Sequence, residues 1–343
     1  MPRYFLDLPE DSGSRRWDPH AGPRPERSDT RFFAGVFKAM EGLLLDPEIH
    51  VHLTWDIDRL PEYGPHVVAV VLRDDGGRLP HYVPCVRAVF KCYGTHPVLG
   101  AGPLRNPGLT GLAELAQYAL RWWRWLPGGV AHARMLAGRR RRGRPAPPRV
   151  SVIPLGTFNQ LDLPVVPLHE RPTDIFFAGS VEHGGDLSRR ISPKTRARRE
   201  MLSAARRMSQ RFPDLRVDIR VTRGFEASAA ASPESYSRAL MDSRVCLAPR
   251  GNSVETFRVL EGLRAGCVIV GERLPKHWFY DGAPVLQLDS WRDLEAVLLP
   301  VLRDPVALES MHAGALAWWR DRCAEAAVGR FMAERLNALG GAP

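Results

Sequence analysis

Residues 243–272 read SRVCLAPRGNSVETFRVLEGLRAGCVIVGE, and this stretch decides the fold. The apolar run at 245–248 predicts a buried strand, and the Pro-Arg-Gly-Asn sequence after it predicts a tight turn. The spacing of apolar residues at 253–265 predicts a helix, and residues 267–270 predict the next strand. A strand, a turn, a helix and a strand in this order are typical of an α/β protein with a parallel sheet.

Both ends of this helix carry recognisable signals. Asn252 and Glu255 have the three-residue offset of a capping box, and Gly266 suits the left-handed conformation that closes a helix. Backbone amides at the start of such a helix, together with the helix dipole, favour an anion, and Gly251 in the turn lets a phosphate approach closely. The stretch therefore predicts an anion site.

Three charged side chains extend this site along the helix. Arg250 and Arg258 are placed to donate charge-assisted hydrogen bonds to a diphosphate. Glu261, one turn beyond Phe257, is placed to accept hydrogen bonds from both ribose hydroxyls. The order of these groups matches a nucleoside diphosphate lying across the helix. A surface salt bridge between Arg258 and Glu261, three residues apart, is the alternative explanation for that pair.

The alternation of strand and helix patterns continues along the chain and predicts the α/β class. Strands are predicted at 3–8, 51–55, 66–72, 88–93, 150–154, 174–180, 216–222 and 285–288, and helices at 31–45, 109–126 and 193–212. Ser192 before Pro193 predicts the start of the last of these helices, because a hydroxyl caps free amides and proline suits the first turn. The proline-containing segment 155–173 predicts an interdomain linker.

Polar residues follow two predicted strands of the first half. Asp74, Asp75 and His96 come after the strands at 66–72 and 88–93, where ligands of open parallel sheets bind, and they are the candidates for a general base. The two aspartates precede a Gly-Gly pair, so a role as turn formers is the alternative for them, and His96 precedes Pro97, so an ordinary loop position is the alternative for it.

No metal site is predicted. Asp56 and Asp58 follow another strand, but Arg59 and Pro61 come next, and the pair is expected to form a turn. Cys85, Cys92, Cys246, Cys267 and Cys323 are odd in number and lack the spacing of metal ligands. The cysteines indicate a reducing compartment, so we expect a cytoplasmic protein.

The composition narrows the class of protein further. A hydrophobic content of 44% with 25% charged residues is that of a folded domain rather than a disordered chain. The net charge is +10, and almost all of the positive charge comes from arginine, since the lysines are only Lys38, Lys91, Lys194 and Lys276. Such a bias is typical of a GC-rich genome, and we do not expect a nucleic-acid partner.

One segment predicts a peripheral membrane contact. Trp122, Trp123 and Trp125 lie on a predicted helix, and the run RRRRGR follows from Arg139 to Arg144. Aromatic side chains beside a cationic segment are what an interfacial anchor requires. The alternative is that the arginines form a solvated loop and that the tryptophans belong to the core. Nowhere do eighteen apolar residues run together, so no membrane-spanning helix is predicted.

The stretch CLAPRGNSVETFRVLEGLRAGCVIV resembles the signature of the exostosin-type glycosyltransferases. That pattern has a strand, Pro-Arg-Gly, a serine or threonine, an aromatic residue and arginine, Leu/Phe-Glu-Ala-Leu, and Ala-Gly-Cys. Ile269 stands where the family usually has proline, and Gly262 where it usually has alanine. The segments RYFLDLPE, DIFFAGSV, SPKTRARREML and LPKHWFYDGAPVLQLDSWRDL resemble further parts of the family in the same order.

The resemblance implies the GT-B fold, with two facing Rossmann-like domains that each hold a parallel sheet. It implies an N-terminal acceptor domain at 1–168, a nucleotide-sugar domain at 169–318, and a C-terminal helix at 319–343 that packs back on the first domain. The donor-binding residues that it implies, together with those of the motif, are Gly179, Ser180, Arg196, Arg198, Arg250, Gly251, Ser253, Thr256, Arg258 and Glu261. Lys194 is a competing candidate for the arginines near it.

The expected activity is transfer of a sugar from a nucleotide diphosphate sugar to an acceptor hydroxyl. The family implies a uridine nucleotide in the donor, and the acceptor is expected to be a saccharide, a glycolipid or a secondary metabolite. The family implies an inverting enzyme, and the GT-B fold one that needs no metal or cofactor. A dehydrogenase or ligase is disfavoured because no Walker loop or G-x-G-x-x-G turn follows a predicted strand. A non-catalytic nucleotide-binding or nucleic-acid-binding module is the alternative.

Overall fold

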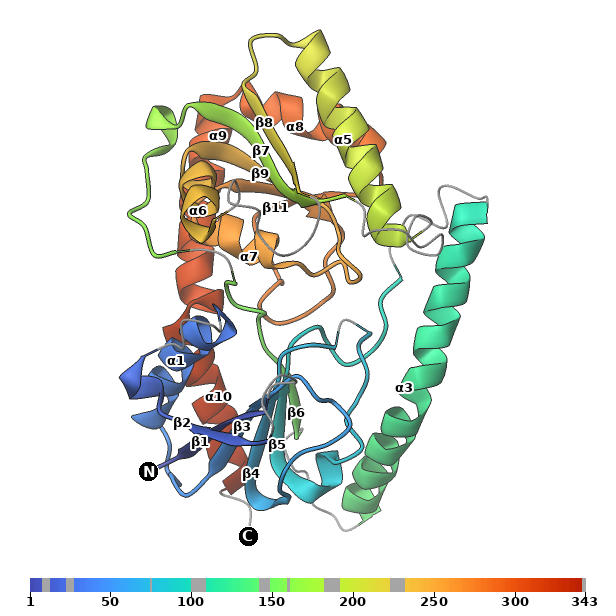
Figure 1. The fold of residues 1–343 in the computed structure, drawn as a ribbon, viewed down its shortest axis with the longest axis vertical. Coiled ribbons are helices and arrows are strands. Elements are labelled where there is room, and N and C mark those ends of the chain that lie inside the picture. The colour runs from blue at the N-terminus through green and yellow to red at the C-terminus, as the bar shows by residue number, and fades with distance from the viewer. Residues whose placement is uncertain are drawn as a thin grey trace. The chain divides into compact units, whose positions relative to one another are not determined.

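The computed structural model describes residues 1–7, 13–22, 28–74, 76–99, 109–141, 149–158, 161–181, 192–222 and 232–340. The chain divides into two compact units. Unit 1 comprises Met1–Val98, Tyr118–Gly156 and Arg322–Pro343, and unit 2 comprises Leu99–Gln117 and Thr157–Asp321. Each unit has its own sheet with helices packed on it (Figure 1), which confirms the α/β class with two parallel sheets.

The sheet of unit 1 has the strand order β2-β1-β3-β4-β5-β6. Its strands are β1 (Arg3–Asp7), β2 (Arg15–Trp17), β3 (His50–Thr54), β4 (Gly64–Val71), β5 (Val86–Lys91) and β6 (Val150–Val152). All pairs are parallel except β1 with β2. The run Val67 to Val71 is completely buried, because helices and loops cover the sheet. From β1 the chain adds the antiparallel β2 on one side, and it then adds β3, β4, β5 and β6 in order on the other.

The helices of unit 1 include one from the end of the chain. They are α1 (Ser28–Glu41), most of α3 (Leu109–Arg141), α10 (Glu325–Gly340), and the short 3₁₀ turns Pro19–Ala21 and Val83–Cys85. α10 packs against α1 in the structure (Figure 1). A Cβ at Gly329 would lie 2.5 Å from the Val36 carbonyl oxygen, so glycine allows the two helices to approach closely.

Helix α3 is longer than the pattern predicted. It continues through Pro127 to Arg141, so the predicted end at residue 126 is wrong. An internal proline removes a backbone hydrogen bond, and here tertiary contacts on both sides hold the helix together. Trp125 Nε1 donates to the Thr95 carbonyl oxygen over 2.7 Å, and a Cβ at Gly128 would lie 1.9 Å from the Leu79 carbonyl oxygen.

The three tryptophans of α3 have different surroundings. Trp123 is 72% exposed, whereas Trp122 is half-buried and Trp125 is bonded to Thr95. Residues 139–141 are helical rather than part of a loop, and residues 142–144 lie outside the described residues. No described helix combines the length and apolar character needed to cross a membrane. The peripheral membrane contact stays a prediction.

The sheet of unit 2 is parallel throughout, with the order β11-β10-β9-β7-β8. Its strands are β7 (Thr173–Ser180), β8 (Val217–Thr222), β9 (Ser243–Ala248), β10 (Val268–Glu272) and β11 (Val285–Leu288). From β7 the chain adds β8 on one side of the sheet, and it then returns to add β9, β10 and β11 on the other. The strand order therefore reverses between β7 and β9, as in the flavodoxin-like doubly wound fold.

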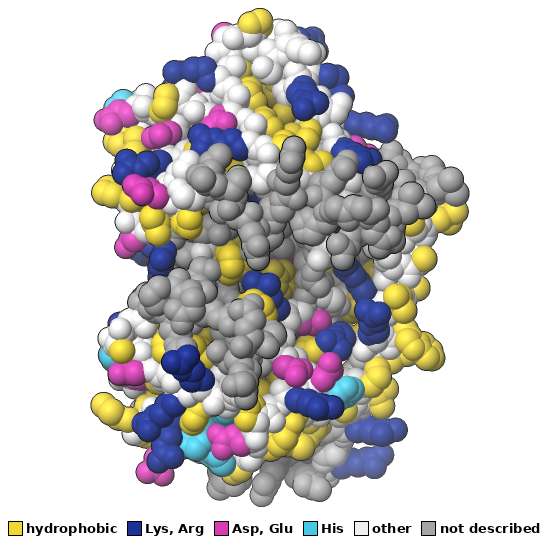
Figure 2. Space-filling view, in the orientation of Figure 1, with side chains coloured by type: hydrophobic (Ala, Val, Ile, Leu, Met, Phe, Trp, Pro, Cys, Tyr) yellow, Lys and Arg dark blue, Asp and Glu magenta, His cyan; other side chains and the backbone are white. Residues whose placement is uncertain are grey.

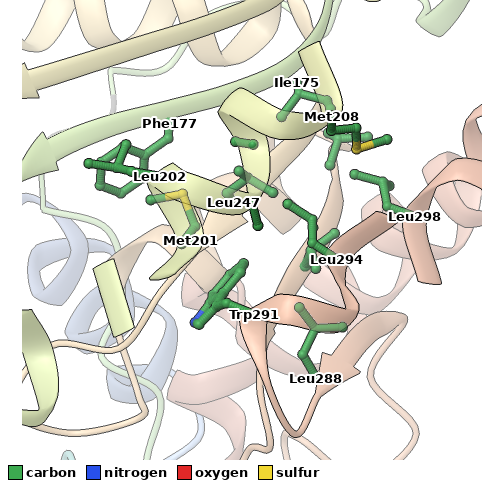
Figure 3. Packing of buried hydrophobic residues seen from close by; sticks show 14 of the residues in the cluster. Ile175, Phe177, Met201, Leu202, Met208, Leu247, Leu288, Trp291, Leu294 and Leu298 are labelled. Atoms are coloured by element: carbon green, nitrogen blue, oxygen red, sulfur yellow. The ribbon is translucent and has the colours of Figure 1, made fainter. Parts of the chain in front are cut away.

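The helices of unit 2 pack on this sheet around one core. They are α5 (Pro193–Arg211), α6 (Pro233–Met241), α7 (Phe257–Arg264), α8 (Leu294–Leu302) and α9 (Pro305–Trp318), with 3₁₀ turns at Leu168–Glu170 and Trp291–Asp293, and a π-helical turn at Trp319–Cys323 that continues into unit 1. Met201 and Met208 of α5 lie among Phe177 of β7, Leu247 of β9 and Leu294 of α8 (Figure 3).

Helix α7 begins later than the predicted residue 253. Asn252 is not its N-cap, so the predicted capping box is wrong; the cap position is Thr256, whose backbone is extended. Ser253 Oγ accepts the Glu255 N–H over 3.2 Å, and this local bond favours a turn over a helix. The predicted end is confirmed, because Gly266 has a φ of +71°.

Candidate functional site

The predicted donor-binding residues gather where the strand order of unit 2 reverses. Ser180 is the last residue of β7, and Arg250 follows the end of β9 by two residues. In open parallel sheets, ligands bind at the carboxyl ends of the strands on either side of such a reversal. Topology alone therefore makes this end of the sheet the place to look for a ligand site.

Arg198 connects the two strand ends. It lies in the second turn of α5, a helix that Ser192 caps by accepting the Thr195 N–H, as predicted. Arg198 is 5% exposed, and its guanidinium donates to the Ser180 carbonyl oxygen and, over 3.2 Å, to that of Arg250. Burial and the positive charge of Arg258 lower the pKa of Arg198. The cation is thus placed in a cluster where a nearby anion would be stabilising.

Arg258 lies over Gly179 in the same region. Its Nε donates to the Ala178 carbonyl oxygen over 2.7 Å, and its guanidinium carbon is 5.1 Å from the centre of the Phe177 ring. A Cβ at Gly179 would lie only 2.0 Å from Arg258 Nη2, and the φ of Gly179 is +154°. Position 179 requires glycine for two reasons: its backbone conformation and the guanidinium beside it.

Gly179→Ala is expected to lower the free energy of unfolding by about 2 kcal/mol, because it strains the backbone and displaces Arg258. Gly13→Ala is the matched control, since Gly13 has a φ of +146° with nothing within 4 Å of a Cβ. Urea unfolding of both variants separates the cost of backbone strain from the cost of displacing Arg258. If the loss in Gly179→Ala is no larger than in Gly13→Ala, or is unchanged in an Arg258→Ala background, Arg258 does not lie as described.

Arg250 and Arg196 add two more cations. Arg250 is 5% exposed; its Nη1 is 3.9 Å from Glu272 Oε2, and its Nη2 donates to the Asn252 carbonyl oxygen over 3.3 Å. Arg196 Nη2 lies 2.8 Å from Glu114 Oε1. Burial raises the pKa of Glu114, although Arg196 and Arg250 oppose that effect. These charges form one electrostatic cluster at the end of the sheet.

Several buried polar atoms of this cluster lack a hydrogen-bond partner among the described residues. Both carboxylate oxygens of Glu114 are among them, and so are four donors: Nε and Nη1 of Arg196, Nε of Arg250 and Oγ1 of Thr256. Buried donors without partners are rare in folded proteins, and they occur at binding and catalytic sites. All four atoms can donate a hydrogen bond, which is what the oxygens of a phosphate group accept.

The remaining residues of the motif line the turn after β9. Ser253 is buried, and its hydroxyl accepts the Glu255 N–H. Gly251 is half-buried, and a Cβ there would come no closer than 3.8 Å to any atom outside its chain neighbours. None of the described residues requires glycine at 251, so close approach of a ligand stays the predicted reason for that residue.

Glu261 is held inside unit 2. It is 1% exposed, its Oε1 accepts the Phe158 N–H over 3.0 Å, and its Oε2 accepts the Tyr236 hydroxyl over 2.8 Å. The carboxylate joins α7 to α6 and to the segment at 157–158. A ribose contact would need the lone pairs that these bonds leave over.

Sequence reasoning missed other polar residues near this site. Glu272 ends β10, so the rule about strand ends would have found it; its Oε1 accepts the Arg250 N–H over 3.4 Å. His277 and Glu255 are both buried, with Nε2 and Oε2 3.6 Å apart. Glu114 lies far away in sequence, and no local pattern marks it. Only the tertiary structure of unit 2 brings Glu114 to Arg196.

The predicted candidates for the general base lie in unit 1. The side chain of Asp74 is 6% exposed, with its carboxylate 3.0 Å from Lys91 Nζ and 3.3 Å from Arg78 Nε. Burial alone would raise the pKa of Asp74, but Lys91 and Arg78 lower it below the ordinary value. His96 is exposed, and its carbonyl oxygen would be 2.4 Å from a Cβ at Gly77, so the loops after β4 and β5 meet. Asp75 lies outside the described residues.

Arginine is spread over the surface. On the face drawn in Figure 2, Lys and Arg side chains are dispersed among Asp, Glu and apolar groups instead of forming one continuous patch. Many arginines are paired, as Arg211 with Glu295, Arg238 with Glu234 and Arg273 with Asp289. Nucleic-acid binding needs basic residues clustered on one face. The visible face does not have that distribution.

Comparison with known proteins gives the following results. No protein-family model matches the sequence, and no curated protein sequence matches it. Among solved structures, the chain is similar to a sucrose-phosphate synthase from Thermosynechococcus elongatus (14% identity, TM-score 0.46, 97% of this chain and 98% of that one). It is also similar to a UDP-N-acetylglucosamine 2-epimerase (10%, 0.40, 92% and 91%) and to AviGT4, a glycosyltransferase involved in avilamycin A biosynthesis (12%, 0.39, 99% and 99%). These similarities are too distant to transfer an activity.

Proposed function

We propose that unit 2 binds a nucleotide diphosphate sugar at the carboxyl ends of β7 and β9, and that the protein transfers the sugar to an acceptor hydroxyl. The observation that supports this most strongly is the convergence of Arg198, Arg250 and Arg258 on the point where the strand order reverses. The motif at residues 243–272, which resembles that of exostosin-type glycosyltransferases, contributes two of these arginines.

The chemical role of these cations follows from the reaction. When the glycosidic bond to the donor breaks, negative charge develops on the departing diphosphate. Buried cations that are already in place stabilise that charge without having to reorganise. The unpartnered donors of Arg196, Arg250 and Thr256 are suited to its oxygens. We therefore propose that the leaving group is stabilised by side chains, without a divalent metal.

The acceptor hydroxyl must lose a proton as it attacks the sugar. Of the two described candidates for the base, His96 is exposed, whereas Asp74 is held in ion pairs that lower its pKa. We retain His96 as the candidate and propose an inverting reaction. A uridine nucleotide as donor and a saccharide, glycolipid or secondary metabolite as acceptor complete the proposal.

Binding of nucleotides tests the proposal directly. Purified protein is heated with uridine, guanosine, adenosine and cytidine diphosphates and their sugars, with EDTA and without it. A nucleotide at about 100 times its Kd stabilises the folded state by about 2.7 kcal/mol, which raises Tm by roughly 5–10 °C for domains of this size. We expect such a shift with one nucleoside diphosphate, unchanged by EDTA.

Other outcomes would point elsewhere. One such outcome is a shift of Tm with a nucleotide, while no acceptor extract causes release of the nucleoside diphosphate from the corresponding nucleotide sugar. That result would favour a non-catalytic nucleotide-binding module. A shift only with DNA or RNA, lost steeply with added salt, would favour nucleic-acid binding and overturn the proposal.

A further inference from the structure

A histidine cluster in unit 1 stands apart from every residue considered so far. His50 and His52 are on β3, and because they are two residues apart their side chains share one face of the sheet. Glu62 and His66 lie on the segment that leads into β4 and on the start of that strand. The cluster is therefore at the amino ends of β3 and β4, whereas Asp74 and His96 follow the carboxyl ends of β4 and β5.

Three imidazole nitrogens converge on one carboxylate. His50 Nδ1 is 2.6 Å from Glu62 Oε1, His52 Nε2 is 2.9 Å from the same oxygen, and His66 Nε2 is 3.7 Å from Glu62 Oε2. The rings of His50 and His66 meet edge to face, with centroids 4.7 Å apart. One ligand atom from each of His50, Glu62 and His66 lies within 4.8 Å of the other two. The three groups need only small rotations to reach one ion.

His52 supports this arrangement from the inside of the sheet. It is 1% exposed, its Nδ1 is 2.7 Å from Asp7 Oδ2, and its ring stacks on Phe5 with centroids 4.8 Å apart. Its Nε2 contacts Glu62 Oε1 and so fixes the orientation of the carboxylate, including the position of Oε2. A chain of carboxylate, histidine and carboxylate of this kind is how proteins orient the groups that bind a metal.

The side chains that face solvent are accessible to an ion. His50, Glu62 and His66 have side-chain exposures of 23%, 35% and 42%. A neutral imidazole has one N–H and one bare nitrogen, so a close contact between a ring nitrogen and a carboxylate oxygen is bridged either by that proton or, at the bare nitrogen, by a cation. Two histidines and one carboxylate suit zinc and related transition-metal ions, whereas Mg²⁺ and Ca²⁺ prefer ligand sets made of oxygen.

We propose that His50 Nδ1, the Glu62 carboxylate and His66 Nε2 bind one divalent transition-metal ion of the zinc class, with His52 as the residue that positions Glu62. The ion would join β3 to the segment entering β4 and stabilise unit 1. The site is independent of the proposed transferase function, because none of its residues belongs to the donor site or to the candidates for the base.

The test uses the full chain without a histidine tag, stripped with chelator and dialysed. Calorimetry with Zn²⁺, and the visible absorption of added Co²⁺, are expected to show one ion per chain, with Mg²⁺ and Ca²⁺ binding far more weakly. Zn²⁺ is expected to raise Tm of the wild-type protein. His66→Ala, at an exposed position, is expected to weaken Zn²⁺ binding by at least about tenfold and to remove most of the Tm shift.

Two further variants make the result specific. His20→Ala is the matched control, because His20 Nε2 is 2.7 Å from Glu41 Oε2 with no third ligand recorded among the described residues; it should bind Zn²⁺ as the wild type does. Glu62→Gln should weaken binding as His66→Ala does. Two results would overturn the proposal. One is that His66→Ala binds Zn²⁺ as tightly as the wild type, and the other is that the wild type does not bind one Zn²⁺ per chain at tens of micromolar Zn²⁺.

Discussion

Asp74→Asn is expected to lower the free energy of unfolding by about 3–5 kcal/mol at pH 7, because it leaves the charge of Lys91 buried without its carboxylate. Lys91 is 0% exposed, and its Nζ lies 3.0 Å from Asp74 Oδ2. The same carboxylate accepts the Arg78 N–H over 2.5 Å and so holds the turn after β4. Denaturation in urea, followed by far-UV circular dichroism, measures the loss.

The effect should depend on pH in a defined direction. Burial opposes ionisation of Asp74, but Lys91 and Arg78 lower its pKa below the ordinary value of about 3.9. A carboxyl whose pKa is lowered by folding contributes stability that is complete above its unfolded pKa and is lost as the pH falls through its folded pKa. The gap between wild type and Asp74→Asn should therefore be constant from pH 7 to about 5 and narrow below about 4.

Asp58→Asn is the control for this experiment. Asp58 also pairs with Arg78, at 3.2 Å, but its side chain is 52% exposed, so its removal should cost less than about 1 kcal/mol. A loss in Asp74→Asn as small as in Asp58→Asn would show that the Lys91 pair is not buried as described. A gap that widened on acidification would contradict the sign of the pKa shift.

Arg250→Ala is expected to weaken binding of the nucleoside diphosphate by about 30-fold or more. Removing one charge that a buried ligand group contacts costs about 2–5 kcal/mol. Arg250 is buried beside Arg198, and its Nε has no partner among the described residues. Removal of its side chain should therefore weaken nucleotide binding more than it destabilises the fold. Calorimetric titration of the nucleotide identified by thermal stabilisation measures the change.

Matched variants separate this effect from general changes of charge. Arg207→Ala removes the same charge from the exposed part of α5 and should leave affinity unchanged. Arg250→Lys keeps the charge without the guanidinium fork and should bind with intermediate affinity. Equal weakening in Arg207→Ala would mean that Arg250 acts only through net charge. Unfolding of Arg250→Ala with unchanged affinity in the folded fraction would mean that it has a structural role alone.

Local signals were sufficient for much of unit 2. The buried strand DIFFAGS, the start of α5 at Ser192 and the end of α7 at Gly266 are all where the sequence predicts them. Each depends on short-range physics: an apolar run, a hydroxyl that caps free amides, and a backbone conformation that favours glycine. The same signals placed Ser180 and Arg250 at strand ends, and hence at one end of the sheet.

Long-range contacts determined the end of α3 and the partners of Glu261, and neither follows from the local sequence pattern. Pro127 does not end α3, because contacts of Trp125 and Gly128 outweigh the lost hydrogen bond. Glu261 is bonded to Phe158 and Tyr236, and no spacing along α7 reveals partners so far away in sequence.

The sequence by itself determined the α/β class, the strands of unit 2, the start of α5 and the end of α7, and it placed the proposed anion-binding side chains at one end of that sheet, because these follow from local conformational preference and from apolar patterning. Only the tertiary structure decided which charges are paired. Asp74 is neutralised by Lys91, Glu114 reaches Arg196, and the histidines of β3 meet Glu62. Such pairings depend on which distant residues share a buried space, and the pKa of each group follows from them.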